Sequence, residues 1–235
     1  MIPDWLHFLI NPEILHNYGW KFYDGFFVTL KLVALSFTIG FLLSITLTFA
    51  WRSKYPFFHY FARAYIYFFR GSPLLAQLFL FYYGIGSFSV FWQSVGLWWF
   101  FKSAWWCCLF IFSLNTAAYQ AEIFRGSMLS VPIGQYEAAK ALGLSQRTTF
   151  IRVIMPQSMI MALRPLGNEF ILMIKASAVA ALVTVYDLMG VAKLAFSRTF
   201  DYQVYIWAAV LYLLIVEVVR RLIDLTERRL TRHLR

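Results

Sequence analysis

The chain has few charged residues: of its 235 residues only 14% are Asp, Glu, Lys or Arg, whereas 61% are hydrophobic and 20% are aromatic. A soluble domain ordinarily has about 25% charged and about 45–50% apolar residues. The composition therefore excludes an ordinary soluble protein and requires a lipid solvent. The net charge of +10 does not indicate nucleic-acid binding, because the basic residues cluster at the ends of apolar runs rather than on one polar domain.

Groups that carry catalysis or bind metals are also scarce. The two cysteines, Cys107 and Cys108, are adjacent inside an apolar run, a poor arrangement for a disulfide, and we expect them only to pack. None of the histidines stands at metal-ligand spacing from a Cys, a Glu or another His; they are His7, His16, His59 and His233. No serine nucleophile motif and no Gly-x-x-x-x-Gly-Lys-Ser/Thr phosphate loop occurs. We therefore expect no catalytic residue, no metal site and no ATPase activity in this chain.

What the sequence has instead is long apolar runs, each near the roughly 20 residues that a membrane-spanning helix needs. They predict an all-α membrane protein with about five spans, at Phe26–Ala50, Phe57–Gly86, Phe100–Tyr119, Ser158–Val183 and Val204–Val219. The second run is broken at Arg70, Gly71 and Pro73, which a membrane protein tolerates where protein or water covers the freed backbone groups. The whole chain, 1–235, is predicted to be a single membrane domain.

The segment from Met1 to Trp20 does not look like a cleavable signal peptide, because it lacks a basic start, an apolar centre and a small-residue cleavage site. Its aromatic residues are typical of a segment at a membrane surface; they include Trp5, Phe8, Tyr18 and Trp20. We therefore interpret residues 1–25 as an external, interfacial segment.

The distribution of Lys and Arg predicts the orientation, because these residues accumulate in cytoplasmic connections. One side of the five-span layout has thirteen: Arg52, Lys54, Arg63, Arg125, Lys140, Arg147, Arg152, Arg220, Arg221, Arg228, Arg229, Arg232 and Arg235. The other side has four: Lys21, Lys102, Lys193 and Arg198. We therefore expect an external N-terminus, a cytoplasmic C-terminus and a cytoplasmic loop at about residues 120–157.

This loop contains the most specific pattern in the chain, a short helix that includes Glu137, Ala138 and Ala139 and stops at Gly143. Gly143 suits a helix C-terminal cap, and Glu137 is expected near the helix start, where the dipole favours an acid. A small helix with alanines on one face is suited to insertion into a groove of another protein. The alternative is an ordinary loop helix lying on the membrane.

Polar residues inside the spans indicate a transport path, because ionisable groups there face protein or water rather than lipid. On the third span Asn115, Tyr119 and Glu122 recur at helical spacing, and on the fourth Arg164, Asn168 and Lys175 do so, with Glu169 beside them. We take Asn168, Glu169, Asn115 and Tyr119 as the candidate lining. The structural alternatives are that the two asparagines bridge helices and that Glu122 pairs with Arg125.

Several stretches resemble the permease subunits of ATP-binding cassette (ABC) importers for polar amino acids. Glu137-Ala138-Ala139, followed by Gly143 and by Val153-Ile154-Met155-Pro156, resembles their EAA loop, with Met155 where leucine is usual. Four further stretches match the family in order: Phe69–Leu74 (with Ser72 in place of threonine), Ala121–Gly126, Ser130–Gln135 and Pro165–Glu169. The likeness extends over nearly the whole chain from Gly25 and is greatest to the M-type subunits for histidine, lysine, arginine, ornithine and opines.

The resemblance implies a type I ABC importer permease in a bacterial inner membrane. Its expected partners are two copies of an ATPase subunit that bind ATP and Mg, a related but unlike second permease, and a periplasmic solute-binding protein. It implies that Glu137, Ala138, Ala139 and Gly143 couple this chain to the ATPase, and that no cofactor binds to the chain itself. The connection from Thr184 to Gln203 faces outside and either contacts the binding protein or is simply solvated.

The sequence specifies the substrate class less closely than it specifies the fold and the partners. Glu169 is the best partner within a span for a cationic substrate, which agrees with the basic amino acids or opines moved by similar permeases. The sequence does not separate these substrates, nor a permease homodimer from a heterodimer. A stand-alone secondary transporter or channel would predict transport without an ATPase, and often an internal inverted repeat. A membrane enzyme would require a catalytic constellation.

Overall fold

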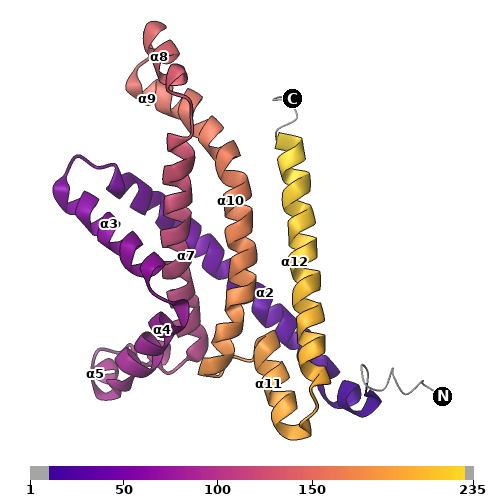
Figure 1. The fold of residues 1–235 in the computed structure, drawn as a ribbon. Coiled ribbons are helices and arrows are strands. Elements are labelled where there is room, and N and C mark those ends of the chain that lie inside the picture. Colours follow the sequence, from indigo (N-terminus) through magenta and orange to yellow (C-terminus); the bar gives the residue numbers. More distant parts are fainter. Residues whose placement is uncertain (1–10, 231–235) are drawn as a thin grey trace.

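The computed structural model describes residues 11–230, and every regular element in that range is a helix (Figure 1). Helices α7 (Ala104–Leu129), α10 (Met155–Ala176) and α12 (Gln203–Leu230) stand side by side, and α2 (Pro12–Trp51) crosses them obliquely. The most extensive helix contact is between α2 and α7. The all-α fold predicted from the sequence is therefore confirmed.

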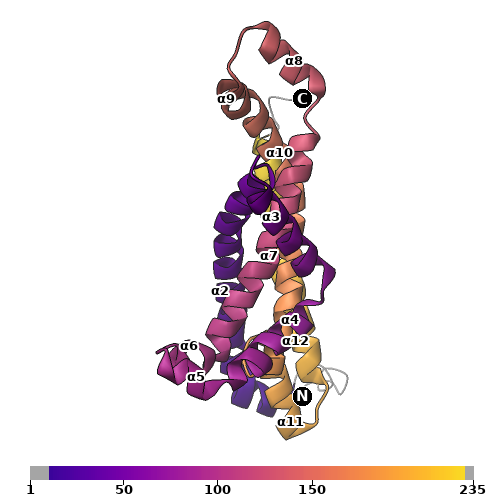
Figure 2. The ribbon, with the colours of Figure 1, turned by 90° about the vertical axis from the view of Figure 1, so that its left-hand side faces the viewer.

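Short helices lie at the two ends of these long ones. At one end are α8 (Ile133–Ala141), α9 (Gln146–Thr149) and the π-helical turn η3 (Phe150–Ile154), which leads into α10 (Figures 1 and 2). Towards the opposite end are α4 (Leu74–Phe79), η1 (Leu80–Gly84), η2 (Ile85–Ser87), α5 (Ser89–Ser94), α6 (Trp98–Phe101), η4 (Ser177–Val183) and α11 (Leu188–Thr199). The described chain begins near α11 and finishes at the α8 end.

Within the described range, three helical stretches are long and apolar enough to cross a membrane: Pro12–Trp51, Ala104–Leu129 and Gln146–Val183. The second expected span is divided into α3 (Pro56–Gly71) and α4, and a shorter apolar stretch runs from Leu74 to Ser87. The fifth expected span lies in α12, which at about 1.5 Å per residue is about 42 Å long. The chain is therefore a helical membrane protein, while the count of five spans and their orientation stay predictions.

Two helices extend further than the apolar runs indicated. Helix α2 begins at Pro12, after Asn11, whose side chain accepts a hydrogen bond from the Glu13 backbone N–H at 3.0 Å. The face of α2 that carries Tyr18 and Phe22 is buried, and the Phe22 ring lies 5.6 Å from that of Trp207 on α12. Residues 12–25 therefore continue the first helix, and residues 1–10, with Trp5 and Phe8, lie outside the described range. Helix α7 continues past the expected end at Tyr119 to Leu129.

Small residues allow α2 and α7 to approach closely. A Cβ added to Gly40 would lie 2.3 Å from Thr116 Cγ2 and 3.1 Å from the Ser113 carbonyl oxygen, so only glycine fits there. Ala117 and Ala121 of α7 are buried in a cluster with Ala62 of α3. Membrane helices associate mainly through this kind of close packing, because lipid supplies no hydrophobic driving force between them. The packing fixes α7, which carries several candidate site residues.

The connection from Thr184 to Gln203 is mostly helical, and one of its acids is not solvated. Asp187 is fully buried and caps α11 by accepting a hydrogen bond from the Gly190 N–H at 2.9 Å. The Tyr212 hydroxyl of α12 donates to the other Asp187 oxygen at 3.0 Å. Burial raises the pKa of Asp187 to about 6. For Asp187 the expectation of a solvated or partner-binding residue is wrong, because it fastens α11 to α12.

Candidate functional site

Helix α8 projects from the end of the helix bundle and exposes most of its surface (Figures 1 and 2). Glu137 and Ala138 are exposed, whereas Ala139 is buried against the rest of the loop. Large apolar side chains at both ends of the segment are also exposed, Ile133 by 75% and Leu142 by 78%. Exposed apolar residues beside small ones are typical of a surface that contacts another protein.

Gly143 ends α8 with a specific turn. Its φ is +70°, a left-handed conformation that side chains disfavour. The Gly143 N–H bonds to the Lys140 carbonyl and the Leu144 N–H bonds to the Ala139 carbonyl, both at 3.0 Å. These two bonds form a Schellman motif, the usual glycine-based helix end. The turn directs the chain back toward α9 and α10.

Glu137 does not lie near the start of its helix, where the sequence led us to expect it. Helix α8 starts at Ile133, after Pro132, and its first turn holds no acidic residue. Glu137 therefore lies in the middle of the helix, beyond the reach of the N-terminal dipole. Glu137 is available on the exposed surface rather than used to stabilise the helix.

A polar cavity of about 230 Å³ lies between α4, α7 and α10. Three of the four residues expected on a substrate path line it, namely Asn115, Tyr119 and Glu169. Pro73, from the expected break, also lines it, and Leu172 and Met173 supply apolar wall. The cavity thus combines one carboxylate, an amide and a phenol with apolar surface, as small-molecule sites usually do.

Among residues 11–230, Glu169 and the Tyr119 phenol are the ionisable groups that line the cavity. It is 7% exposed, and the Thr116 hydroxyl donates to its Oε1 at 3.1 Å. Gln120 in turn donates to Thr116 Oγ1 at 3.1 Å and to the Phe37 carbonyl at 3.2 Å. No ion pair of Glu169 is seen among residues 11–230. A buried carboxylate with so little compensation is suited to a cationic ligand.

The break between α3 and α4 is held by side-chain amides. Ser72 and Pro73 are extended, so the carbonyls at the end of α3 lose their helical partners. Gln77 donates to the Phe69 and Ser72 carbonyls, both at 3.0 Å. Asn115 of α7 donates to the Phe69 carbonyl at 3.1 Å and to Gln77 Oε1 at 2.9 Å. Asn115 therefore bridges helices, as the structural alternative proposed, and also lines the cavity.

Asn168 lies apart from this group. It is exposed and does not line the cavity, whereas its neighbour Glu169 is buried and does. Consecutive helical residues point about 100° apart, so the two cannot share one face. Arg164, four residues before Asn168, is exposed and forms an ion pair with Glu227 of α12 at 3.0 Å. The fourth-span face that holds Arg164 and Asn168 is therefore distinct from the cavity face.

An ion cluster lies beside the cavity. Glu122 accepts two hydrogen bonds from Arg125, in agreement with the structural alternative for this acid. Arg70, at the end of α3, lies 3.8 Å from the same carboxylate, and its guanidinium stands 5.5 Å from the centre of the Tyr119 ring. Since Tyr119 lines the cavity, Arg70 reaches the cavity wall from the side of the break.

Thr116, Gln120 and Gln77 were not among the candidates from the sequence. All three are buried polar residues, and burial of such groups requires hydrogen-bond partners. Thr116 and Gln120 stand four residues apart on α7, which puts them on one face. The spacing of four could have marked Thr116 and Gln120 as one polar face of α7. The sequence does not show that this face meets Glu169 and the Phe37 carbonyl.

Within residues 11–230 no group of three or more His, Cys, Asp or Glu that would hold a metal is found, and Cys107 and Cys108 are buried free thiols.

The apolar helices, the cavity with its partly polar lining and the exposed helix at one end fit a membrane component of a solute transport system. The chain belongs to the binding-protein-dependent transport system inner membrane component family, whose model matches residues 25–232. It is 40% identical to the nopaline transport system permease protein NocM of Agrobacterium fabrum, over 88% of this chain and 86% of that protein. It is 35% identical to the histidine/lysine/arginine/ornithine permease protein HisM of Escherichia coli K12, over 95% and 97% of the two chains.

A solved structure of an amino acid ABC transporter matches the fold with a TM-score of 0.83 and 33% identity, over 97% of this chain and 100% of that chain. The resemblance to ABC importer permeases is therefore confirmed, including the type I permease fold. The chain is a membrane-embedded permease subunit that works with an ATPase and is not itself an enzyme. The stand-alone channel and the membrane enzyme are not supported by these relatives.

Proposed function

We propose that this permease moves basic amino acids or opines inward across a bacterial inner membrane, as a multi-pass subunit with its α8 end in the cytoplasm. The observation that carries the substrate class is the buried Glu169 carboxylate in the cavity wall, beside Asn115 and Tyr119. The proposal agrees with the substrates in the names of similar permeases, which are nopaline, octopine, arginine and histidine/lysine/arginine/ornithine.

The cavity chemistry favours a cationic substrate for a physical reason. A carboxylate that accepts one hydroxyl bond keeps further acceptor capacity, and an ammonium or guanidinium group would supply charge-assisted donors. A neutral amino acid has no second positive group to offer to Glu169. The apolar wall at Leu172 and Met173 suits the methylene stem of such a side chain.

The partners follow from the exposed helix α8 and its glycine turn. In the proposed assembly α8 inserts into a groove of an ATPase subunit, with the exposed Glu137, Ala138 and Gly143 forming the contact. Ala139, which the sequence also assigned to this contact, is buried and packs α8 against its own chain instead. Two ATPase copies bind ATP and Mg, so this chain needs no cofactor of its own. A second, related permease completes the path, and a periplasmic solute-binding protein delivers the substrate. The positive charge of the connections at the α8 end supports a cytoplasmic location.

Uptake by the reconstituted complex tests the substrate class. Proteoliposomes would hold this chain, its partner permease, the ATPase and the binding protein, and would receive labelled arginine, lysine, histidine, ornithine or nopaline. Glu169→Gln keeps the shape and the Thr116 contact but removes the charge. Loss of a charge-assisted bond of about 1.5–3 kcal/mol predicts roughly 10- to 100-fold weaker uptake of cationic substrates.

The matched control is Glu217→Gln, which removes a half-buried carboxylate of α12 that pairs with Arg220 and Arg221 and does not line the cavity. This variant is expected to transport normally. Normal uptake by Glu169→Gln, or equal losses in the two variants, would remove Glu169 from substrate recognition.

A further inference from the structure

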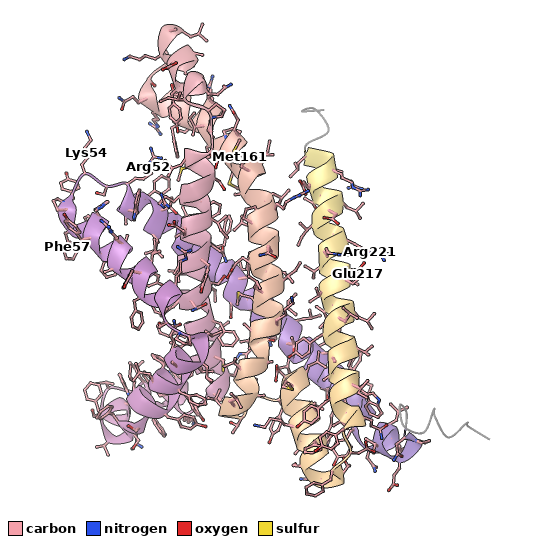
Figure 3. All side chains as sticks on the ribbon, viewed as in Figure 1. Arg52, Lys54, Phe57, Met161, Glu217 and Arg221 are labelled. Carbon is pink, nitrogen blue, oxygen red and sulfur yellow. The ribbon has the colours of Figure 1, made fainter. Side chains whose placement is uncertain are left out.

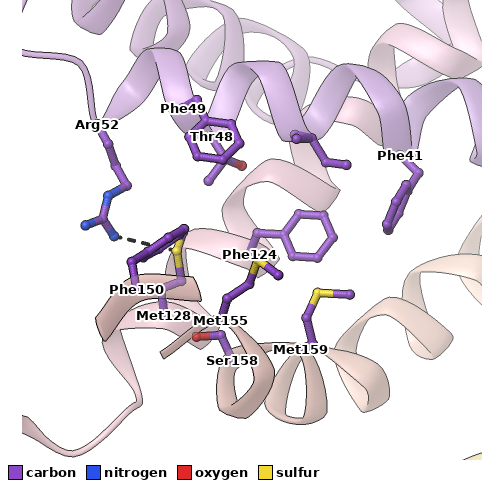
Figure 4. A pocket seen from close by; sticks show the side chains of 11 residues that line it. Phe41, Thr48, Phe49, Arg52, Phe124, Met128, Phe150, Met155, Ser158 and Met159 are labelled. Atoms are coloured by element: carbon purple, nitrogen blue, oxygen red, sulfur yellow. Dashed lines mark hydrogen bonds between the residues drawn. The ribbon is translucent and has the colours of Figure 1, made fainter. Parts of the chain in front are cut away.

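An apolar groove of about 260 Å³ separates the C-terminal half of α2 from the α7 and α10 helices (Figure 4). Its α2 wall carries Phe41, Ile45, Phe49 and Arg52, and its other wall includes Phe124 and Met159. The two hydroxyl groups in the lining are already satisfied, because Thr48 donates to the Ser44 carbonyl and Ser158 to the Ile154 carbonyl, both at 2.7 Å. Except for Arg52, the groove therefore offers only apolar contact.

Arg52 stands at one end of the groove and has weak partners. Its guanidinium donates to Met128 Sδ at 3.6 Å and lies 5.5 Å from the centre of the Phe150 ring (Figure 4). The structure shows no carboxylate paired with Arg52 among residues 11–230. At the other end, the Phe41 and Phe124 rings meet edge to face with centroids 5.5 Å apart. The groove thus runs from an aromatic pair to a positive charge that has no carboxylate partner among residues 11–230.

Measured along the oblique axis of α2, the groove is about as long as the hydrocarbon half of a bilayer is thick. From Phe41 to Arg52 the helix rises about 16 Å, at about 1.5 Å per residue. The hydrocarbon core of a bilayer is about 30 Å thick, so one leaflet spans about 15 Å. Arg52 lies at the α8 end of the molecule, where the sequence concentrates Lys and Arg (Figure 3). An acyl chain in the groove would therefore place its headgroup at Arg52.

We propose that this groove binds one acyl chain of an anionic phospholipid, with the lipid phosphate paired to Arg52. Basic pockets between membrane helices on the cytoplasmic side suit anionic headgroups. The bound lipid would join α2 to Phe150 of η3, at the base of the segment that carries α8.

Lipid retention by the purified complex tests the proposal independently of transport. The complete complex in mild detergent would be titrated with phosphatidylglycerol and with phosphatidylcholine of the same acyl chains, and bound lipid counted by native mass spectrometry. We expect a preference of about five-fold for phosphatidylglycerol, because one Arg or Lys near anionic lipid contributes roughly that factor. Glycerol phosphate, which has the headgroup charge but no chain, is expected to bind far more weakly.

Variants locate the site. Arg52→Gln should abolish the preference and Arg52→Lys should keep it, which also controls for misfolding. Lys54→Gln, a neighbouring exposed cation that does not line the groove, should leave the preference unchanged (Figure 3). Ile45→Trp should fill the groove and reduce retention of both lipids.

Three results would overturn the proposal. The first is equal retention of the two lipids by the unmodified complex, as expected of lipid that merely surrounds the protein. The second is a preference that survives Arg52→Gln, or glycerol phosphate binding as tightly as lipid. The third is a disulfide between Ile45→Cys and a cysteine introduced in the second permease, which would show that protein covers the groove.

Discussion

The turn at Gly143 allows a sharp test of how α8 acts, because the same substitution has opposite effects at two glycines of one segment. Gly143 has φ +70°, and a Cβ added there meets nothing within 4 Å. Gly143→Ala therefore creates no clash, and its cost is the left-handed backbone alone, about 1–2 kcal/mol. Such a cost lowers the population of the native turn relative to its alternatives by roughly 5- to 30-fold.

Gly134 is the matched control within α8. A Cβ added there also meets nothing within 4 Å, and its backbone is not left-handed. Alanine is better than glycine in a helix by about 0.5–1 kcal/mol, so Gly134→Ala should strengthen α8. Asparagine adopts the left-handed conformation more readily than alanine, so Gly143→Asn should be milder than Gly143→Ala. Gly143→Asp adds a negative charge to the turn and should insert normally but uncouple ATP hydrolysis from uptake.

The assay is uptake per ATP hydrolysed, measured on the complex in proteoliposomes. We expect Gly134→Ala to equal the unmodified chain, with coupling falling from Gly143→Asn to Gly143→Ala. The melting temperature should stay unchanged throughout, because the turn lies in an exposed projection rather than in the packed helices. Equal coupling by Gly143→Ala and Gly134→Ala would refute the argument that this turn positions α8.

Two predictions concern the buried polar groups that shape the site. Gln77→Ala removes the amide donor of the Ser72 carbonyl, removes one of the two donors of the Phe69 carbonyl, and takes away the Gln77 Oε1 acceptor of Asn115. Since an unsatisfied buried polar group costs roughly 1–3 kcal/mol, this variant should lower the melting temperature in detergent. Exposed Gln93→Ala should not, and equal melting of the two variants would contradict the role given to Gln77. Asp187→Ala removes the α11 cap and the Tyr212 partner and should destabilise the protein, unlike exposed Asp24→Ala. Burial raises the pKa of Asp187 to about 6, so between about pH 4 and pH 6 the unfolded chain loses this proton more readily than the folded protein does. The free energy of unfolding should therefore decline as pH rises through this range. Asp187→Asn should remove that decline, and the same pH profile in the variant and the unmodified protein would contradict this role of Asp187.

Much of the helical architecture could be predicted from the apolar runs. In lipid the backbone N–H and C=O groups must form their hydrogen bonds within the chain, so a long apolar run indicates a helix. The break at Arg70–Pro73 and the turn at Gly143 were also accessible, since proline and glycine restrict the backbone in known ways. The Glu122–Arg125 pair followed from their spacing of three on a helix. These are all local effects, which a single segment of sequence specifies.

Contacts between distant segments were less accessible. Helical spacing predicted that Asn115 and Tyr119 share one face of α7. It did not predict that this face meets Glu169 of α10. Asn168 and Glu169 were predicted to line one path, but the side chains of consecutive helical residues point about 100° apart. Asp187 resembled a loop acid because its partner, Tyr212, is on another helix. Whether Asn168, Glu169, Asn115 and Tyr119 touch the substrate stays a prediction.

The most direct test of the account is substrate-stimulated ATP hydrolysis by the complex of this chain with the products of adjacent genes, reconstituted in lipid with the binding protein. The account predicts that arginine, lysine, histidine or an opine stimulates hydrolysis, and that Glu137→Lys, on the exposed face of α8, abolishes the stimulation while Glu217→Lys on α12 does not. The account is contradicted if no ATPase co-purifies and the chain alone moves solute down its gradient, or if Glu137→Lys hydrolyses ATP like the unmodified complex.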